Sequence, residues 1–300
     1  MATHEALPSK KHLPLGGARA INTPEVEQFI SNTMSNNFMD LVRKKGLVPE
    51  FLEAYHSWIM STTYNQFGGL EQFKFKSYTN GTTETFDKWY IANQGRRLRM
   101  FRGEYMYHLA THQNLRLPHA YLEDEPLDAN DHVIISMPFA DSGNVRFETQ
   151  HILDTANILG VPVLIDAAYV GLTEDISFDF SHPAIETVAF SLSKTFPVAH
   201  ARIGMRLSKY DTDDGIDIYR KTEYENRWGA ALGLSLIDKF SIDMNTELYK
   251  PMQVITCQEM GVMPSNTVLF GLGGKKWNEY SRGGLYNRLY LGGIYEQVDI

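Results

Sequence analysis

The chain has 300 residues, of which 43% are apolar and 21% charged, so it is long enough for one large core with a smaller appended lobe. Its net charge of −8 at pH 7 and its lack of long lysine and arginine runs argue against a nucleic-acid-binding surface. A single cysteine excludes a disulfide framework and suggests a reducing compartment. The sequence contains neither a signal-peptide core nor a run of about 18 apolar residues. We therefore expect a cytoplasmic protein without a membrane span.

The first part of the chain is predicted to be an irregular arm followed by two helices. Residues 1–22 are rich in glycine, proline and lysine. Thr23 and Pro24, followed by acidic residues, form a typical helix start. A second helical pattern covers residues 48–60, with apolar side chains gathered on one side.

The stretch from residue 73 to residue 84 combines a short strand with a helix start. Residues 73–79 alternate as F-K-F-K-S-Y-T, and N-G-T-T-E follows at residues 80–84. Backbone N–H groups around Gly81, the hydroxyls of Thr82 and Thr83, and the positive end of the helix can together form a cradle for an anion. Simple capping of the helix by Thr82 or Thr83 is the alternative explanation.

The next segments have the pattern of a parallel α/β sheet. Residues 97–101 and 132–139 read as strands, and residues 148–159 read as a helix that ends at Gly160. That helix leads into an apolar run at residues 161–165, so strand, helix and strand follow one another as in a βαβ unit.

Two apolar runs, residues 161–165 and 187–192, have the length and β-branched content of buried strands. In or soon after these runs come polar residues, namely Asp166, Tyr169, Ser191, Ser193, Lys194 and, eight residues after the lysine, Arg202. Ligands of open parallel sheets bind where the strands end, so this grouping predicts a binding site. The alternative is a structural ion pair between solvated loop ends.

These residue types suit one cofactor in particular. Pyridoxal phosphate (PLP) needs a lysine for a Schiff base with its aldehyde, a carboxylate beside its pyridine nitrogen, and an arginine with hydroxyls for its phosphate. The patterns D-x-A-Y at residues 166–169, S-x-S-K at residues 191–194 and R-x-G at residues 202–204 resemble the core of the aminotransferase class I/II family. Those proteins are fold-type I PLP-dependent enzymes.

The resemblance implies a role for each of these residues and for several others. It implies a Schiff base at Lys194, a carboxylate at Asp166 that holds the pyridinium, and a phenol at Tyr169 beside the ring oxygen. The further cofactor-binding residues that it implies are Gly81, Thr82, Thr83, Ser191, Ser193 and Arg202, together with Tyr105 as the ring-stacking aromatic and Tyr64 as the residue that reaches the neighbouring subunit's phosphate.

Two more residues are assigned by the same resemblance. His108, three residues after Tyr105, is expected to lie behind Asp166 and to steady its charge. With His112 four residues on it forms a conceivable metal pair, but no third ligand candidate is nearby, so no metal site is predicted. Arg288 corresponds to the arginine that grips the substrate's α-carboxylate, for which a planar guanidinium fork is well suited; Arg282 and Arg227 are the next candidates.

The chain departs from the family's pattern in two places. The turn after residue 137 reads P-F-A-D-S-G, so Ala140 stands where the family has an asparagine that hydrogen-bonds the cofactor's ring oxygen. Asn144 and Asp141 are the candidates to replace it. In addition, only 12 residues separate Gly69 from Gly81, where the family has a longer helix and connection.

The C-terminal part is predicted to be helical and then stranded. Residues 209–215 read as a polar loop, residues 223–240 as a helix, and a further helical stretch runs to about Met260 with an interruption near Pro251. Residues 266–272 and 287–291 read as strands of a small lobe. The glycine-rich residues 271–276 lack the spacing of a phosphate-binding loop and are predicted to form a turn.

The predicted fold is therefore α/β, with a mostly parallel sheet of seven strands, as the resemblance implies, and helices on both faces. We expect a large PLP-binding domain at residues 50–240, a small lobe made of residues 1–49 and 241–300, and a homodimer. The predicted function is that of an aminotransferase acting on an amino acid and a keto acid through Lys194. The alternatives are another PLP-dependent reaction on an amino acid, such as that of a decarboxylase, a β- or γ-lyase or an oxidase, and a cofactor-free binding protein on the same fold.

Overall fold

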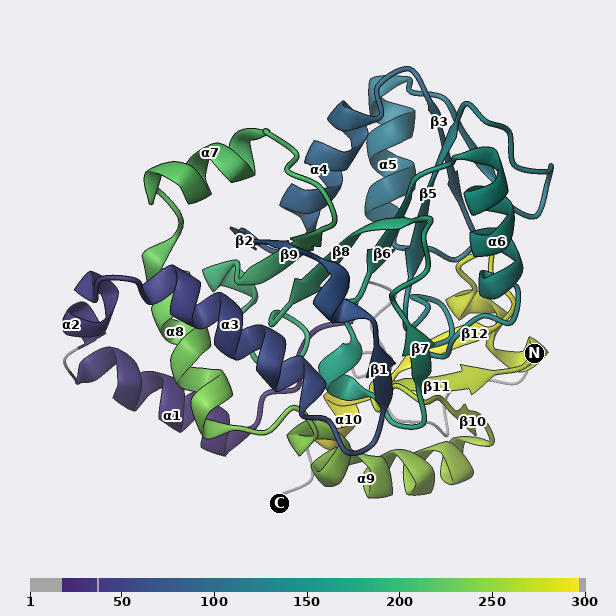
Figure 1. Ribbon diagram of the computed structural model, residues 1–300. Helices are drawn as coiled ribbons and strands as arrows, with labels where there is room; N and C mark the ends of the chain where they lie inside the picture. The colour runs from purple at the N-terminus through teal and green to yellow at the C-terminus, as the bar shows by residue number, and fades with distance from the viewer. Residues whose placement is uncertain (1–17, 37, 297–300) are drawn as a thin grey trace.

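The computed structural model describes residues 18–36 and 38–296, so most of the predicted N-terminal arm, residues 1–17, lies outside the described residues. Its centre is a seven-stranded sheet with the strand order β2-β9-β8-β6-β5-β3-β4 (Figure 1). The strands are β2 (Phe75–Thr79), β3 (Arg97–Met100), β4 (His119–Tyr121), β5 (Asp131–Ser136), β6 (Val163–Asp166), β8 (Ile185–Ser191) and β9 (Gly204–Ser208). Only β9 runs against its neighbours, β2 and β8, so the predicted mostly parallel α/β fold is confirmed.

Side chains alternate between the two faces of this sheet. Ile134 and Leu164 pack on one face with aromatic residues of α4 (Thr82–Ala92), next to α5 (Met106–Leu115). Their neighbours Val133 and Val163 pack on the other face, which is covered by α3 (Leu47–Met60), α6 (Thr149–Leu159) and α8 (Arg227–Lys239). Because successive strand residues point to opposite faces, these runs of apolar residues need cover on both sides.

The N-terminal helices pack on this second face. Helices α1 (Pro24–Ser35) and α2 (Phe38–Arg43) contact α8, and Val26, Phe38 and Val42 belong to the main core. Pro24 begins α1 as predicted, but the hydroxyl of Thr23 pairs with the Tyr249 hydroxyl, 2.7 Å away, instead of capping the helix.

A second, smaller core lies below the central sheet in Figure 1. It is built from α9 (Met244–Met260), α10 (Gly292–Tyr295) and an antiparallel sheet of β10 (Met263–Pro264), β11 (Phe270–Gly273) and β12 (Asn287–Tyr290), and Ala18 and Ile21 also join it. The division into a large domain and a small lobe at the predicted residues stays a prediction.

Short elements complete the chain. They are β1 (Gln66–Gly68), which pairs with β7 (Ser177–Asp179), helix α7 (Gly215–Thr222), and the 3₁₀ helices η3 (Leu70–Gln72), η4 (Val170–Leu172), η5 (Ala199–Ala201) and η6 (Lys275–Tyr280). Within residues 18–36 and 38–296, no helix is long and apolar enough to cross a membrane.

Several features differ from the predictions. Residues 271–276, expected to form a turn, lie mostly in β11 and η6. Helix α9 continues through Pro251, although a proline inside a helix costs about 3 kcal/mol. Tertiary contacts oppose that cost: the buried amide of Gln253 donates to the carbonyl oxygens of Ser265, Thr267 and Phe270 at 2.7–3.1 Å. Helix α7 was not predicted; it begins where the Asp214 carboxylate accepts hydrogen bonds from the backbone of Ile216 and Asp217.

Candidate active site

The predicted site residues meet where the strands of the central sheet end. Asp166 ends β6 beside Ser136 of β5, and Ser191 ends β8 beside Gly204 of β9, which also pairs with Thr79 of β2. One cavity, of about 160 Å³, forms at this edge. Of the predicted residues, its wall contains Thr82, Thr83, Tyr105, Asp166, Tyr169, Ser191, Ser193, Lys194, Arg202 and Arg288, and it also contains Ala18, Arg19, Ala140, Ala168, Ala199 and Arg282.

One end of the cavity is an anion cradle at the start of α4. The Arg202 guanidinium donates to the Thr83 hydroxyl at 3.0 Å, and no carboxylate within the described residues forms an ion pair with it. Gly81 has a φ of +78°, and a Cβ at this position would lie 2.9 Å from Arg202 Cζ. Neither Thr82 nor Thr83 caps the helix; instead the Glu84 carboxylate accepts from the Asn80 N–H at 2.6 Å. The two threonine hydroxyls are therefore not used as helix caps.

Lys194 also lines the cavity. Its ammonium donates to the backbone carbonyl of Ala18, while its neighbour Ser193 is held by an N–H bond to the Ser191 hydroxyl at 3.2 Å. The hydroxyl of Ser193 is buried and has no hydrogen-bond partner among residues 18–36 and 38–296. A buried hydroxyl without a partner is costly, so the site is suited to a ligand that supplies one.

The segment that carries Ala18 was not predicted to contribute to the site. It is held against α10 by Glu296, whose Oε1 accepts from Arg19 and from the Asn22 N–H, both at 2.8 Å. Because Ala18 and Lys194 are far apart in the chain, no local pattern in the sequence could have indicated this contact.

Two buried carboxyl groups lie side by side beneath the cavity. Burial, followed by the neighbouring Glu104 carboxyl, raises the pKa of Asp166 to about 7, while the Ala168 N–H and Lys194 act in the opposite direction. Burial likewise raises the pKa of Glu104 to about 7, although Ser136 donates to it from both its N–H, at 2.7 Å, and its hydroxyl, at 2.5 Å. Sequence reasoning missed Glu104; the only signal was an acidic residue directly before the predicted ring-stacking tyrosine.

Tyr105 lines the cavity, and its ring meets the His108 ring edge-on, with centroids 5.9 Å apart. His108 is fully buried. Its Nδ1 pairs with the Tyr90 hydroxyl at 2.7 Å, and its Nε2 has no partner among the residues that the structure describes. Burial lowers the pKa of His108 to about 3, so this ring is neutral at pH 7. In the described part of the chain, no hydrogen bond joins His108 to Asp166. The expected stabilisation of the Asp166 carboxylate by a His108 hydrogen bond is therefore not seen.

The other end of the cavity is formed by residues of β12 and of the turn after β5. Arg288 stacks over the Phe270 ring, with Cζ 4.4 Å from the centroid, and donates to the Ala140 carbonyl at 2.5 Å. Arg282 donates to the same carbonyl at 3.1 Å. Tyr169 packs edge-on against Phe270, with ring centroids 5.4 Å apart.

The candidates to replace the missing asparagine lie outside the cavity. The side-chain oxygen of Asn144 accepts from the Asn266 N–H at 2.9 Å, and the buried Asp141 carboxylate accepts from the Tyr286 N–H at 3.5 Å. At position 140 it is therefore the backbone carbonyl, rather than a side chain, that supplies a polar group. Arg227 is also elsewhere, since it donates to the backbone of Val42 at 2.8 Å.

Tyr64 does not line the cavity of its own chain. It is 41% exposed and precedes β1, which is followed by η3 and not by a long helix. Its expected contact with a neighbouring subunit stays a prediction.

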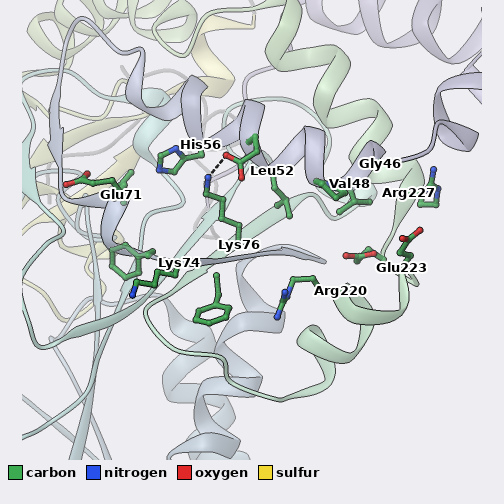
Figure 2. A pocket seen from close by; sticks show the side chains of 16 residues that line it. Gly46, Val48, Leu52, His56, Glu71, Lys74, Lys76, Arg220, Glu223 and Arg227 are labelled. Carbon is green, nitrogen blue, oxygen red and sulfur yellow. Dashed lines mark hydrogen bonds and ion pairs between the residues drawn. The ribbon is translucent and has the colours of Figure 1, made fainter.

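A larger hollow, of about 680 Å³, lies on the α3 side of the sheet (Figure 2). Figure 2 shows Leu52 and His56 of α3 above Lys74 and Lys76, with Arg220 and Arg227 towards the right of the view. Its charged residues include the ion pair between Lys76 and Glu53, 2.5 Å apart. It lies away from the parallel strand ends and, of the residues that the sequence suggested, contains only Arg227, an alternative candidate for the carboxylate-binding arginine. We therefore assign the site to the smaller cavity.

No protein-family model matches the chain, and comparison with curated proteins finds no relative. Solved structures are similar over nearly the whole chain. An aromatic aminotransferase from Pyrococcus horikoshii OT3 superposes with a TM-score of 0.68 and 13% identity, covering 98% of this chain and 94% of its own. The aminotransferase AspB from Helicobacter pylori 26695 gives a TM-score of 0.66 and 12% identity over 94% and 90% of the two chains.

An aspartate aminotransferase from Thermotoga maritima gives a TM-score of 0.64 and 14% identity over 94% and 88% of the two chains. At such identities the likeness concerns the fold alone. The chain has the fold of the fold-type I aminotransferases, as the sequence motifs indicated.

Proposed function

We propose that this protein is a PLP-dependent aminotransferase that moves an amino group between an amino acid and a keto acid. The proposal is supported by one observation: Lys194, Asp166, Tyr105 and Arg202 all line one cavity. PLP needs a lysine for the Schiff base, an acid for its ring nitrogen, an aromatic ring to stack on and a cation to bind its phosphate.

The donors present fit this cofactor. Arg202, the hydroxyls of Thr82 and Thr83 and the first N–H groups of α4 suit a phosphate, and the absence of a Cβ at Gly81 leaves the backbone free to approach it. The unpartnered Ser193 hydroxyl supplies a further donor, and Ser191 fixes the chain beneath it. Asp166 would be the acid for the ring nitrogen, Tyr105 would supply an aromatic face for the pyridine, and Tyr169 would supply a hydroxyl for the ring oxygen.

When bound, PLP supplies an electron sink for the bonds of the substrate's α-carbon. Lys194 would be the residue that holds the cofactor covalently, and its free amine would be placed to take and return the proton at that carbon. Asp166 has to be ionised to hold a protonated ring nitrogen. Burial and Glu104 oppose its ionisation, whereas the Lys194 charge and the Ala168 N–H favour it, so its state depends on what fills the cavity.

We further propose that the protein is a cytoplasmic homodimer. Its single cysteine, Cys257, is buried, which agrees with a reducing compartment. Exposed aromatic side chains support an interface: Tyr64 is 41% exposed, Trp228 is 53% exposed and Tyr224 is 80% exposed. Tyr64 would then complete the phosphate site of the neighbouring subunit.

A different PLP-dependent reaction on an amino acid is the second candidate. It is favoured by Ala140, because this residue brings no side-chain donor to the ring oxygen and so changes the electronic tuning of the cofactor. Incubating the holoenzyme with panels of amino acids and keto acids, with detection of keto acid, CO₂ and ammonia, separates the two. Keto acid formed with an aminated partner supports transamination, whereas CO₂ or free ammonia alone supports the second candidate. A protein without cofactor absorbance after addition of PLP would instead be a binding protein.

A further inference from the structure

We propose that Glu104 is a positioning residue that acts through Asp166: its buried carboxyl controls whether Asp166 carries a negative charge, and so sets the pH range in which the cavity accepts a pyridinium ring. The role toward the cofactor rests on the proposed function. The coupling between the two carboxyl groups is a property of this chain and can be measured without any cofactor.

The two carboxyl groups lie on the same side of the central sheet. Asp166 of β6 is the register partner of Ser136 of β5, and the side chains of partner residues on adjacent strands point to the same face. Glu104 accepts from the Ser136 N–H at 2.7 Å and from the Ser136 hydroxyl at 2.5 Å. Because neighbouring strands are only about 4.8 Å apart, a carboxylate bound to the Ser136 side chain lies beside Asp166.

Glu104 receives more hydrogen bonds than Asp166 does. Besides the two from Ser136, its carboxylate accepts one from the Tyr105 N–H at 3.2 Å. Within the described residues Asp166 accepts one, from the Ala168 N–H at 3.2 Å. Hydrogen bonds to the charged form of a carboxyl favour its ionisation, so Glu104 keeps the negative charge and the first proton that the pair takes up goes to Asp166.

Burial makes this pair unlike two ordinary surface acids. Each residue is only 6% exposed, and among residues 18–36 and 38–296 neither carboxyl forms an ion pair. Burial, and after it Glu104, raises the pKa of Asp166 to about 7, and burial also raises the pKa of Glu104 to about 7. Two adjacent negative charges repel strongly where water is excluded, so the pair takes up its first proton near neutral pH.

The other charged or titratable groups that face the pair come from four segments. They are Tyr90 of α4, Tyr105 before α5, Lys194 after β8 and Arg282 after η6. The charge of Lys194 favours ionisation of Asp166, and that of Arg282 favours ionisation of Glu104. Neither cation outweighs burial.

The coupling has a direct consequence for a ligand in the cavity. A protonated Asp166 offers no negative charge to a pyridinium ring, so cofactor binding should weaken as the pH falls through about 7. Without the charge of Glu104, Asp166 would stay ionised to a lower pH, although its own burial would still hold its pKa above the ordinary value.

The first test follows proton binding to Asp166 in the apoprotein, through the ¹³C signal of its carboxyl carbon in aspartate-labelled protein. The signal is identified by its loss in Asp166→Asn. Glu104→Gln keeps the size of the side chain and removes its charge, so it should weaken proton binding to Asp166 about ten-fold or more. Glu186→Gln is the matched control: burial also raises the pKa of Glu186, but this residue lines a different cavity, so Asp166 should not respond.

A reciprocal measurement keeps the proposal testable if Glu104→Gln does not fold, as judged by circular dichroism. Coupling between two sites is mutual, so in glutamate-labelled Asp166→Asn the Glu104 signal, assigned by its loss in Glu104→Asp, should show proton binding weakened by the same factor. Unchanged proton binding to Asp166 in folded Glu104→Gln, or to Glu104 in Asp166→Asn, would overturn the proposal.

The second test titrates wild type and Glu104→Gln with PLP at several pH values. The wild-type affinity should fall as the pH decreases through about 7, and the variant should keep its affinity to about one pH unit lower. Lys194 is present in both proteins, so the difference between the two profiles reports the change at Glu104. Identical profiles would refute the link to cofactor binding.

The two tests separate this inference from the proposed function. If PLP does not attach to Lys194 but Glu104→Gln weakens proton binding to Asp166, the proposed function fails and the coupled carboxyl pair stands. If PLP attaches to Lys194 and neither Asp166 nor the pH profile responds to Glu104→Gln, the coupled pair fails and the proposed function stands.

Discussion

Replacing Gly81 by alanine should disturb the phosphate end of the cavity specifically. Gly81 has φ +78° and ψ 173°, a conformation that residues with a side chain rarely adopt. An added Cβ would also lie 2.9 Å from Arg202 Cζ and closer still to its Nη2. Gly95 is a matched control, because its φ is +95° but nothing lies within 4 Å of a Cβ built there.

The expected magnitudes differ between stability and binding. Both substitutions carry a backbone cost of about 1–3 kcal/mol in the free energy of unfolding. At Gly81 the clash involves the end of a flexible side chain, so the Arg202 guanidinium can move away and little further stability is lost. That movement breaks its 3.0 Å bond to Thr83 and the alignment with a bound phosphate. Losing one charge-assisted hydrogen bond of about 1.5–3 kcal/mol weakens binding by roughly 10- to 100-fold.

Denaturant unfolding of the apoprotein and titration with PLP measure the two effects separately. Gly81→Ala and Gly95→Ala should be destabilised to a similar extent, while only Gly81→Ala should lose affinity for PLP. If Gly81→Ala bound PLP as tightly as Gly95→Ala and the wild type, then Arg202 and the start of α4 would not be the phosphate anchor.

Three other predictions concern the acid and the arginines. Asp166→Ala should reduce turnover far more than Asp166→Glu, since a ring nitrogen needs a negative partner; equal rates would make this acid merely structural. The pKa of Asp166 is about 7 in the folded apoprotein, above its ordinary value of 3.8, so the folded state binds this proton more tightly than the unfolded state. The free energy of unfolding that Asp166 contributes therefore falls as the pH rises from about 4 to 7. In urea unfolding, the stability of Asp166→Asn relative to wild type should increase over that range. A flat difference would contradict the raised pKa. Arg288→Lys should weaken amino-acid binding and leave PLP binding unchanged, whereas Arg202→Lys should weaken PLP binding and leave amino-acid binding unchanged. Separate titrations with PLP and with amino acid measure the two effects. A loss of both affinities in either variant would refute this division of roles.

Much of the fold could be predicted because it is encoded in local patterns. The runs at residues 161–165 and 187–192 are apolar throughout, as strands covered on both faces must be, and the polar residues after them necessarily meet at one sheet edge. Gly160 has a φ of +66° and ends α6 as expected for a glycine after a helix. Pro251 was misjudged because a local rule was applied where buried contacts of α9 outweigh it.

The parts of the site that could not be predicted come from contacts between distant segments. Arg282 reaches a carbonyl 142 positions away, and the Ala18 carbonyl reaches Lys194 across 176 positions. Such contacts depend on how the smaller core packs against the sheet, and no periodicity encodes that packing. Glu104 was missed for a related reason, because its proximity to Asp166 arises only when β3 and β6 are in one sheet.

The most direct test of the account is to reduce the PLP-loaded protein with borohydride and to map the modified lysine by peptide mass spectrometry. The account predicts that the cofactor is found on Lys194 alone, and that Lys194→Ala retains its fold by circular dichroism but yields no labelled peptide and no turnover. A label on another lysine, or no label after reduction of a protein that has been saturated with PLP, would contradict it.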